Sequence, residues 1–259
     1  MVAAGYAPTT VATRVNAVRA ALKAAVRDRL ISADPSAGLR LPARRRHEHA
    51  MEIPTPLQVR KLLHVSEPRM QAYLGLCAFA GLRLGEASAV GLGNVDFLGR
   101  RLHVRQQVQR RRGGQAELRQ PKYGSERTVY LPNRLVEMLA LHIETTGTAA
   151  DGWLFFTADN RPIPPSTVNS WWQRTLRAAE VQGVHLHAMR HFYASGLIAS
   201  GCDVVTVQRA LGHRSPSTTL DTYSHLWPSA EDRTRDGAAS LTDLVLEHAA
   251  DSLRTGDGN

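Results

Sequence analysis

The chain has 259 residues, which is enough for one large domain or two modest ones. Hydrophobic residues make up 43% of it and charged residues 21%, the composition of an ordinary soluble globular protein. Two cysteines are too few for a disulfide framework, and the longest apolar run, residues 72–82, is too short to span a bilayer, so we expect a cytoplasmic protein without a membrane segment.

The net charge of +9 favours a polyanionic partner, and the distribution of that charge narrows the choice. Residues 1–50 hold nine Lys and Arg against three Asp and Glu, and residues 100–127 hold nine against two. Residues 228–259 instead hold three against seven. Two concentrated basic segments are typical of a surface that contacts phosphates, so we expect a partner that carries phosphate groups.

The first predicted element is an amphipathic helix that starts after Pro8 and ends before a turn at residues 34–38. Its apolar residues recur every three or four positions and form one stripe. Three basic residues lie off the stripe and are candidate DNA contacts, although such charges more often form a solvated helix face: Arg14, Arg19 and Lys23. Residues 40–52 then have the composition of an interdomain linker, with three arginines that could follow a DNA backbone: Arg44, Arg45 and Arg46.

A second, larger domain is predicted beyond this linker. Residues 73–82 are almost all apolar and indicate a buried helix, which places Arg83 just past a rigid element. Residues 100–131 have strand composition with two turn signals, which predicts a small three-stranded antiparallel sheet with Lys122 at its second turn. The first turn carries a basic cluster that is either a solvated turn or, as we expect from its place beside Lys122, a phosphate contact: Arg110, Arg111 and Arg112. Helical periodicity returns at residues 132–144 and 166–181.

The segment from His187 to Tyr223 concentrates groups that can act on a phosphodiester. It holds a His-x-x-Arg motif at residues 187–190, a Leu-Gly-His motif at residues 211–213 and a tyrosine ten residues after that histidine. An arginine offers a planar fork of donors to phosphate oxygens, a histidine can donate or move a proton, and a tyrosine hydroxyl can be a nucleophile. The periodicity between the motifs predicts short helices that present these groups from their ends.

This arrangement resembles the tyrosine recombinases, the phage-integrase family. In that family an upstream arginine followed three residues later by an acid completes the motifs, and Arg83 with Glu86 matches this pair. A lysine on a β-hairpin lies between the two halves of the family's signature, and Lys122 within residues 120–127 matches it. Six family positions are therefore matched in the expected order: Arg83, Lys122, His187, Arg190, His213 and Tyr223.

The resemblance implies covalent cleavage of DNA. Tyr223 would attack the phosphorus to form a 3′-phosphotyrosine and release a 5′-hydroxyl. Arg83 and Arg190 would clamp the non-bridging oxygens, with His187 and His213 as further donors, because fixed cations there stabilise the developing charge. His187 would be the proton acceptor for the tyrosine, and Lys122 would protonate the leaving oxygen. Glu86 would accept a hydrogen bond from the catalytic arginine or histidine and so hold it in position, without contacting the DNA itself.

The same resemblance implies what the reaction needs. A covalent intermediate conserves the phosphodiester energy, so we expect no cofactor, neither ATP nor a divalent metal; the sequence contains no phosphate-binding Gly-rich loop and no cluster of acids typical of two-metal catalysis. Strand exchange would need a homotetramer on two DNA sites, assembled from a chain that is a monomer in solution. The apolar positions of residues 239–259 would pack into a neighbouring protomer, and an accessory directionality factor is compatible with the family.

We therefore predict a mainly α protein with a small antiparallel β-sheet, an α+β fold. Residues 1–46 would form a partial core-binding segment and linker, residues 50–238 the catalytic domain and residues 239–259 a C-terminal helix or tail. The family's core-binding domain normally has about four helices, and only one or two fit before the linker. Either half of that domain has been lost, or the coding sequence starts upstream of Met1.

Three alternatives compete with this interpretation. Type IB topoisomerases use related chemistry, but the ten-residue spacing from His213 to Tyr223 and the hairpin favour the recombinase. His187 and His191 are four residues apart and could suggest zinc, but no third ligand accompanies them, so no metal is predicted. A truncated DNA-binding remnant that no longer recombines is the remaining rival. The recognition sequence, the type of mobile element and the choice between integration and excision are not encoded in these patterns.

Overall fold

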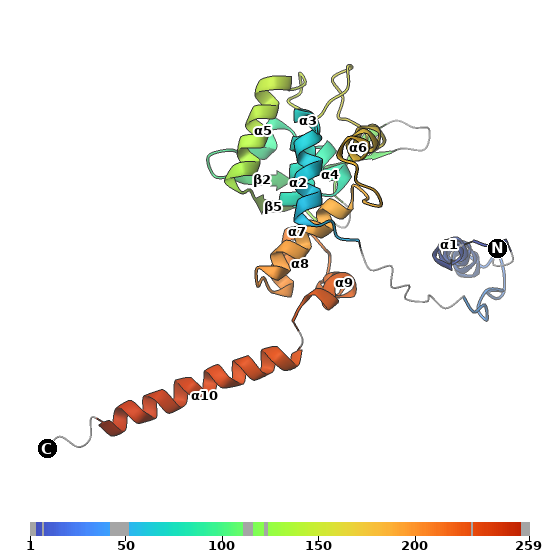
Figure 1. Cartoon of the computed structure of the whole chain (residues 1–259). Helices are drawn as coiled ribbons and strands as arrows, with labels where there is room; N and C mark the ends of the chain where they lie inside the picture. The colour runs from blue at the N-terminus through green and yellow to red at the C-terminus, as the bar shows by residue number, and fades with distance from the viewer. Residues whose placement is uncertain are drawn as a thin grey trace. The chain divides into compact units, whose positions relative to one another are not determined.

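The computed structural model describes residues 4–6, 8–41, 52–110, 116–121, 124–228 and 230–254 (Figure 1). The chain divides into two compact units, Met1–Met51 and Glu52–Asn259. The predicted boundary between residues 46 and 50 falls outside the described residues. In the first unit, helix α1 (Pro8–Arg27) is followed by turns, and the Arg19 side chain donates to the backbone carbonyls of Ser36 and Leu39. These bonds fold the turn back onto the helix.

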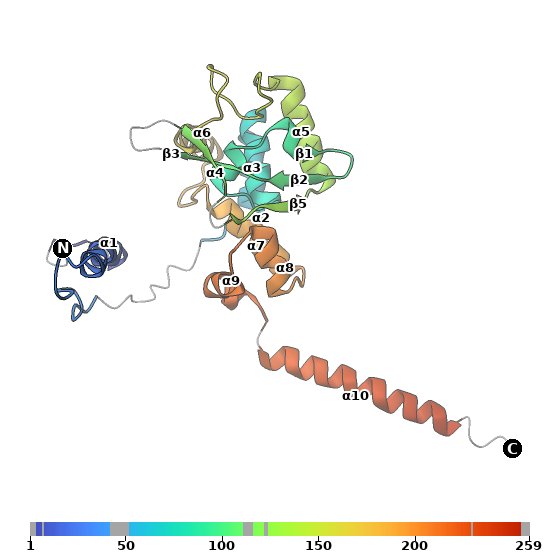
Figure 2. The ribbon, with the colours of Figure 1, turned by 180° about the vertical axis from the view of Figure 1, so that it is seen from behind.

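The second unit is mainly helical with short antiparallel strands, which confirms the predicted fold class (Figures 1 and 2). Its elements follow in chain order: α2 (Pro56–Val65), α3 (Pro68–Phe79), α4 (Leu84–Ser88), η1 (Leu92–Asn94), β1 (Val95–Asp96), β2 (Arg101–Val104), β3 (Gln107–Arg110), β4 (Ala116–Arg119), β5 (Arg127–Tyr130), α5 (Asn133–Thr146), α6 (Pro165–Ala179), α7 (Ala188–Ala199), α8 (Val204–Leu211), α9 (Pro216–Tyr223), η3 (Ser224–Leu226) and α10 (Ala230–Arg254).

Helix α3 forms the centre of the second unit because its residues from Ala72 to Ala78 are apolar or small on every face. Eight of its twelve residues are buried, from Met70 to Ala78. It packs against α5 on one side and α7 on another, while α2 contacts α6. A helix that is hydrophobic all round requires such enclosure. Since α3 ends at Phe79, a short turn of three residues connects this buried helix to Arg83, the first candidate site residue.

The strands differ from the predicted single sheet. The first predicted strand is interrupted at residues 105–106, so that β2 pairs with β1 and β5 in one antiparallel sheet, whereas β3 and β4 form a separate two-stranded ladder. Leu102 faces Val129 across the first ladder, and Val108 faces Leu118 across the second. The prediction of one three-stranded sheet over residues 100–131 was therefore wrong.

Contact with α4 explains why β3 leaves the sheet. A Cβ added at Gly85 would lie 2.6 Å from the Val108 carbonyl oxygen, so β3 approaches the backbone of α4 as closely as a glycine permits. The Gln107 side chain also donates to the Gln120 carbonyl at 2.9 Å, which ties the end of β4 to β3. This is a tertiary contact that strand composition does not encode.

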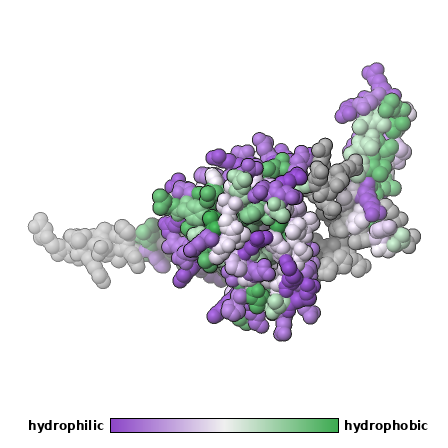
Figure 3. Space-filling view, turned by 90° about the horizontal axis from the view of Figure 1, so that it is seen from above, coloured by the Kyte–Doolittle hydropathy of each residue, from purple (hydrophilic) through white to green (hydrophobic). Residues whose placement is uncertain are grey.

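The outer surface of the larger unit is polar on the face shown in Figure 3, where hydrophobic residues form small separate patches. None of the helices among the described residues is long and apolar enough to cross a membrane. Helix α10 begins at Ala230, earlier than the predicted segment at residues 239–259, and several of its apolar side chains are exposed: Leu241, Leu244, Val245 and Leu246.

The turn between α3 and Arg83 provides a test of the fold. Gly81 has a φ of +64°, and an added Cβ would lie 2.7 Å from Tyr193 Cε1. Gly81→Ala should therefore destabilise the protein by more than about 1 kcal/mol. In Gly196→Ala, a matched change within α7, the new methyl group meets open space, so it should be neutral or stabilising by up to about 1 kcal/mol. Urea unfolding of both variants measures this, and equal effects would contradict the argument.

Candidate active site

Arg83 lies where two buried segments meet. It is the N-cap of α4, and its side chain retains 25% exposure, so the guanidinium is both anchored and open to a ligand. Its backbone N–H donates to Glu86 Oε2 at 2.9 Å, and its Nη1 donates to Glu86 Oε1 at 2.6 Å. Glu86 therefore holds Arg83 by its main chain and its side chain together.

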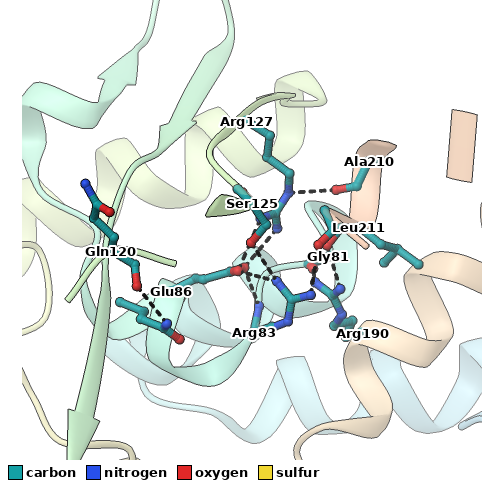
Figure 4. A network of polar contacts seen from close by, with 11 residues as sticks. Gly81, Arg83, Glu86, Gln120, Ser125, Arg127, Arg190, Ala210 and Leu211 are labelled. Carbon is teal, nitrogen blue, oxygen red and sulfur yellow. Dashed lines mark hydrogen bonds and ion pairs between the residues drawn. The ribbon is translucent and has the colours of Figure 1, made fainter. Parts of the chain in front are cut away.

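Glu86 also binds a second arginine, Arg127, at the start of β5. The Arg127 Nη2 donates to Glu86 Oε2 at 2.8 Å and its Nη1 to Oε1 at 3.2 Å (Figure 4). Burial raises the pKa of Glu86, but the hydrogen bond and charge of Arg127, with the charges of Arg83 and Arg190, outweigh it and hold the pKa at about 2. One ionised carboxylate thus links α4 to the strand that follows the segment of Lys122.

Three arginines bind three consecutive carbonyls at the end of α8. Arg127 Nε donates to Ala210 O at 3.0 Å, Arg190 Nη2 to Leu211 O at 2.6 Å and Arg83 Nη2 to Gly212 O at 2.9 Å. The last carbonyls of a helix lack partners within the helix and carry the negative end of its dipole, so guanidinium groups are suitable caps. The arrangement gathers arginines from α4, β5 and α7 around one helix end.

Arg190 is the most buried of these arginines, with 2% exposure. Its Nη1 donates to the Gly81 carbonyl, so the side chain joins the end of α3 to the end of α8 (Figure 4). Burial and the charge of Arg83 lower its pKa to about 9, which still leaves it cationic at neutral pH. Three guanidinium groups against one carboxylate leave this cluster with two net positive charges, suited to bind a phosphodiester.

Tyr223 and His213 complete the cluster from the next two elements. Tyr223 ends α9 and is 1% exposed, and burial raises the pKa of its phenol to about 12 despite the opposing charge of Arg190. His213 follows α8, and its ring stacks in parallel with that of Tyr223, with the centroids 6.5 Å apart. The His213 Nδ1 is 2.9 Å from Thr219 Oγ1, which fixes the ring. Burial, then the nearby arginines, lower the pKa of His213 to about 4.

His191, rather than His187, provides the hydrogen bond to the tyrosine among the described residues. The His191 Nδ1 lies 2.7 Å from the Tyr223 hydroxyl. The His187 ring meets His191 edge-on, with centroids 5.0 Å apart, as expected for residues four apart at the start of α7. Burial, then His187 and Arg190, lower the pKa of His191 to about 4, so its ring is neutral at physiological pH. Burial and the arginines also lower the pKa of His187.

The structure brings five of the predicted catalytic residues into one cluster: Arg83, His187, Arg190, His213 and Tyr223. Lys122 lies outside the described residues, and its catalytic role stays a prediction. Sequence reasoning did not single out Arg127 or assign His191 a role in catalysis. Arg127 stands within the predicted hairpin, and His191 directly follows the His-x-x-Arg motif, but only the tertiary structure shows their contacts with Glu86 and with the Tyr223 hydroxyl.

The predicted DNA contacts are described only in part. Arg14 stacks over the Tyr6 ring at 4.7 Å and is exposed, as is Lys23, whereas Arg19 is partly buried by its bonds to the turn. The side chains of the other basic candidates fall outside the described residues: Arg44, Arg45, Arg46, Arg110, Arg111 and Arg112. Their contact with DNA stays a prediction.

The Glu86 network predicts a specific loss of stability in acid. Because the pKa of Glu86 is depressed, its carboxylate stabilises the folded state at pH values above the ordinary pKa of 4.5. This stabilisation is lost as the pH falls from there through about 2. That shift corresponds to about 3 kcal/mol. Glu86→Gln should lower the free energy of unfolding at neutral pH by about 3–5 kcal/mol, because it leaves the buried Arg127 and the partly buried Arg83 without a counter-charge.

The same variant should also lose much of the dependence of stability on acid pH, measured by urea unfolding across that range. Glu126→Gln, an exposed neighbour of Arg127, is the matched control and should keep the wild-type acid profile. An unchanged profile in Glu86→Gln would show that the buried carboxylate does not carry this dependence.

The sequence and the fold of this chain are both similar to those of known proteins. The chain is 28% identical to the tyrosine recombinase of Thermosipho africanus over 162 residues, covering 62% of this chain and 51% of that protein. It is 28% identical to the tyrosine recombinase XerC of Alcanivorax borkumensis over 236 residues, covering 86% of this chain and 70% of that protein. The chain thus spans about half the length of the first of these relatives.

Among solved structures, the Tn1549 transposon integrase in complex with a circular intermediate DNA matches with a TM-score of 0.74. The match covers 93% of this chain and 82% of that chain at 19% identity, which supports the fold. The model of the phage integrase family matches residues 54–229. This range is more than half of the chain and most of the unit that contains the arginine cluster. This chain therefore belongs to the phage integrase family.

Proposed function

We propose that this protein is a site-specific DNA recombinase that cleaves and rejoins DNA through a 3′-phosphotyrosine intermediate, for integration or excision of a phage or other mobile element. The observation that carries the proposal is the convergence of Arg83, Arg190, His213 and Tyr223, from separate elements, on the end of α8. A phosphodiester bound there would meet fixed donors on its non-bridging oxygens, and these stabilise the transition state more than the ground state.

The residues divide the chemistry between them. The Arg83 side chain is partly exposed and would bind the phosphate first. Arg190 is buried and would contact the phosphate from the interior side of the site. An anionic phosphate would raise the pKa of His213, so that the bound state favours the protonated, donating ring. Lys122 would protonate the 5′-oxygen as the P–O bond breaks. No step in this scheme requires ATP or a divalent metal.

Double-stranded DNA is the proposed partner, and strand exchange would involve a homotetramer on two sites formed from monomers in solution. The exposed apolar residues of α10 support contact with another copy of the chain, since such residues favour burial. An accessory directionality factor would set the balance between integration and excision.

Trapping the covalent complex tests the proposed function. The substrate would be a pool of duplexes with a random sequence around a nick just 3′ of the scissile phosphate, because a released short fragment cannot religate. With a chelator present, the wild-type protein should give a denaturant-resistant protein–DNA band, and Tyr223→Phe should give none while retaining DNA in a mobility shift. A wild-type protein that retains DNA without a covalent band would instead identify a DNA-binding remnant.

The role of Lys122 can be separated from that of the nucleophile. Lys122→Ala should slow cleavage of an ordinary phosphodiester by about 10²–10⁴-fold, because the 5′-oxygen then leaves without a proton. A substrate with sulfur at the 5′-bridging position needs no such proton and should be cleaved by Lys122→Ala at nearly the wild-type rate. Tyr223→Phe should remain inactive on both substrates. Slow cleavage of the sulfur substrate by Lys122→Ala would contradict the general-acid assignment.

A further inference from the structure

Tyr223 is almost wholly enclosed by protein, so a neighbouring side chain is the nearest candidate to take its proton. The residue is 1% exposed, and the hydroxyl therefore has little access to bulk water as a base. Its phenol pKa of about 12, raised by burial, makes the unassisted phenolate scarce at neutral pH. A proton acceptor must also lie within hydrogen-bond reach of the oxygen that attacks.

Two histidines, His191 and His213, contact the tyrosine, and a third, His187, contacts His191, so their geometry separates their roles. His213 stacks on the face of the Tyr223 ring with an interplanar angle of 9°, and its Nδ1 is committed to Thr219. His187 contacts the edge of the His191 ring rather than the phenol. His191 alone among these three has a ring nitrogen at 2.7 Å from the hydroxyl, the length of a strong hydrogen bond.

We propose that His191 is the general base that takes the proton of Tyr223, an inference that rests on the proposed function. The phenolic O–H bond breaks and its proton moves to Nδ1 of His191, while the phenolate oxygen forms the new bond to phosphorus. The bond from phosphorus to the 5′-oxygen breaks, and that oxygen receives its proton from Lys122. In resealing, the 5′-hydroxyl attacks phosphorus and gives its proton back to Lys122, while the bond from phosphorus to Tyr223 breaks and His191 returns its proton to the departing phenolate.

The surroundings of His191 suit this role. The proposed role requires the tautomer in which Nε2 carries the hydrogen, so that Nδ1, 2.7 Å from the hydroxyl, can accept from it. Its lowered pKa keeps that acceptor free before DNA binds. Arg190 precedes it on α7, so one helix would carry both a phosphate-binding arginine and the base. The edge contact from His187 supports the orientation of the ring.

Substitution at His191 can separate proton transfer from packing. In His191→Asn the side-chain oxygen can occupy the position of Nδ1 and accept the same hydrogen bond, but it cannot take up a proton. Single-turnover cleavage of the nicked substrate by this variant should be about 100-fold slower or more. His185→Asn, a change at an exposed histidine before α7, is the matched control and should cleave like wild type.

A fluorinated tyrosine at position 223 provides the decisive readout. Its phenol has a lower pKa and needs less help to ionise, so it should restore most of the rate lost in His191→Asn while changing wild type little. Urea unfolding and DNA retention, which should match wild type, exclude misfolding as the cause of the loss. A wild-type rate in His191→Asn, or a loss that fluorotyrosine does not repair, would overturn the role of His191.

These outcomes are distinct from failure of the proposed function. If neither wild type nor His185→Asn forms a covalent complex with the substrate, the recombinase proposal fails and the role of His191 fails with it. If both form the complex and only the His191 results depart from expectation, the recombinase proposal stands and another group is the base. Substituting His187 in the same fluorotyrosine background would then test the alternative acceptor.

Discussion

The binding of three arginines to three successive carbonyls at the end of α8 is the constraint on which the site depends. Ala210, Leu211 and Gly212 each accept from a different guanidinium group, and Glu86 balances two of those groups from the opposite side. Each arginine comes from a different element, so the helix end can be capped only when α4, α7 and β5 are all in place. The cationic centre is therefore a product of the assembled fold, not of any one segment.

Burial of charge gives this centre its capacity to bind phosphate. Arginines held by carbonyl dipoles remain cationic at neutral pH, even where burial lowers the pKa, as at Arg190. The same positive field and the same burial keep His191 and His213 neutral, since both effects disfavour an added proton. A phosphodiester entering the site would meet donors that are already oriented. Its negative charge would also make protonation of the two histidines less unfavourable.

Glu86 also couples Arg83, in the first half of the family's signature, to the strand that follows the segment of Lys122. It binds Arg83 beside the central helix α3 and Arg127 at the start of β5, a few residues after Lys122. The strand that continues from the segment of Lys122 is thus attached to the arginine that would bind the phosphate. Any displacement of β5 would disturb the same carboxylate, which gives a physical reason for an acid three residues after Arg83.

The sequence by itself determined the mainly helical class, the buried helix before Arg83 and the order of the chemical motifs, because local periodicity and motif spacing are properties of short segments. It did not determine that β3 leaves the sheet to pack on α4, since a contact through Gly85 and Val108 depends on distant residues. It also did not identify Arg127 as a partner of Glu86 or His191 as the neighbour of the Tyr223 hydroxyl. Only the tertiary structure decided those pairings, because a hydrogen bond between residues 32 or 41 positions apart is set by how helices and strands pack, and no local pattern records it.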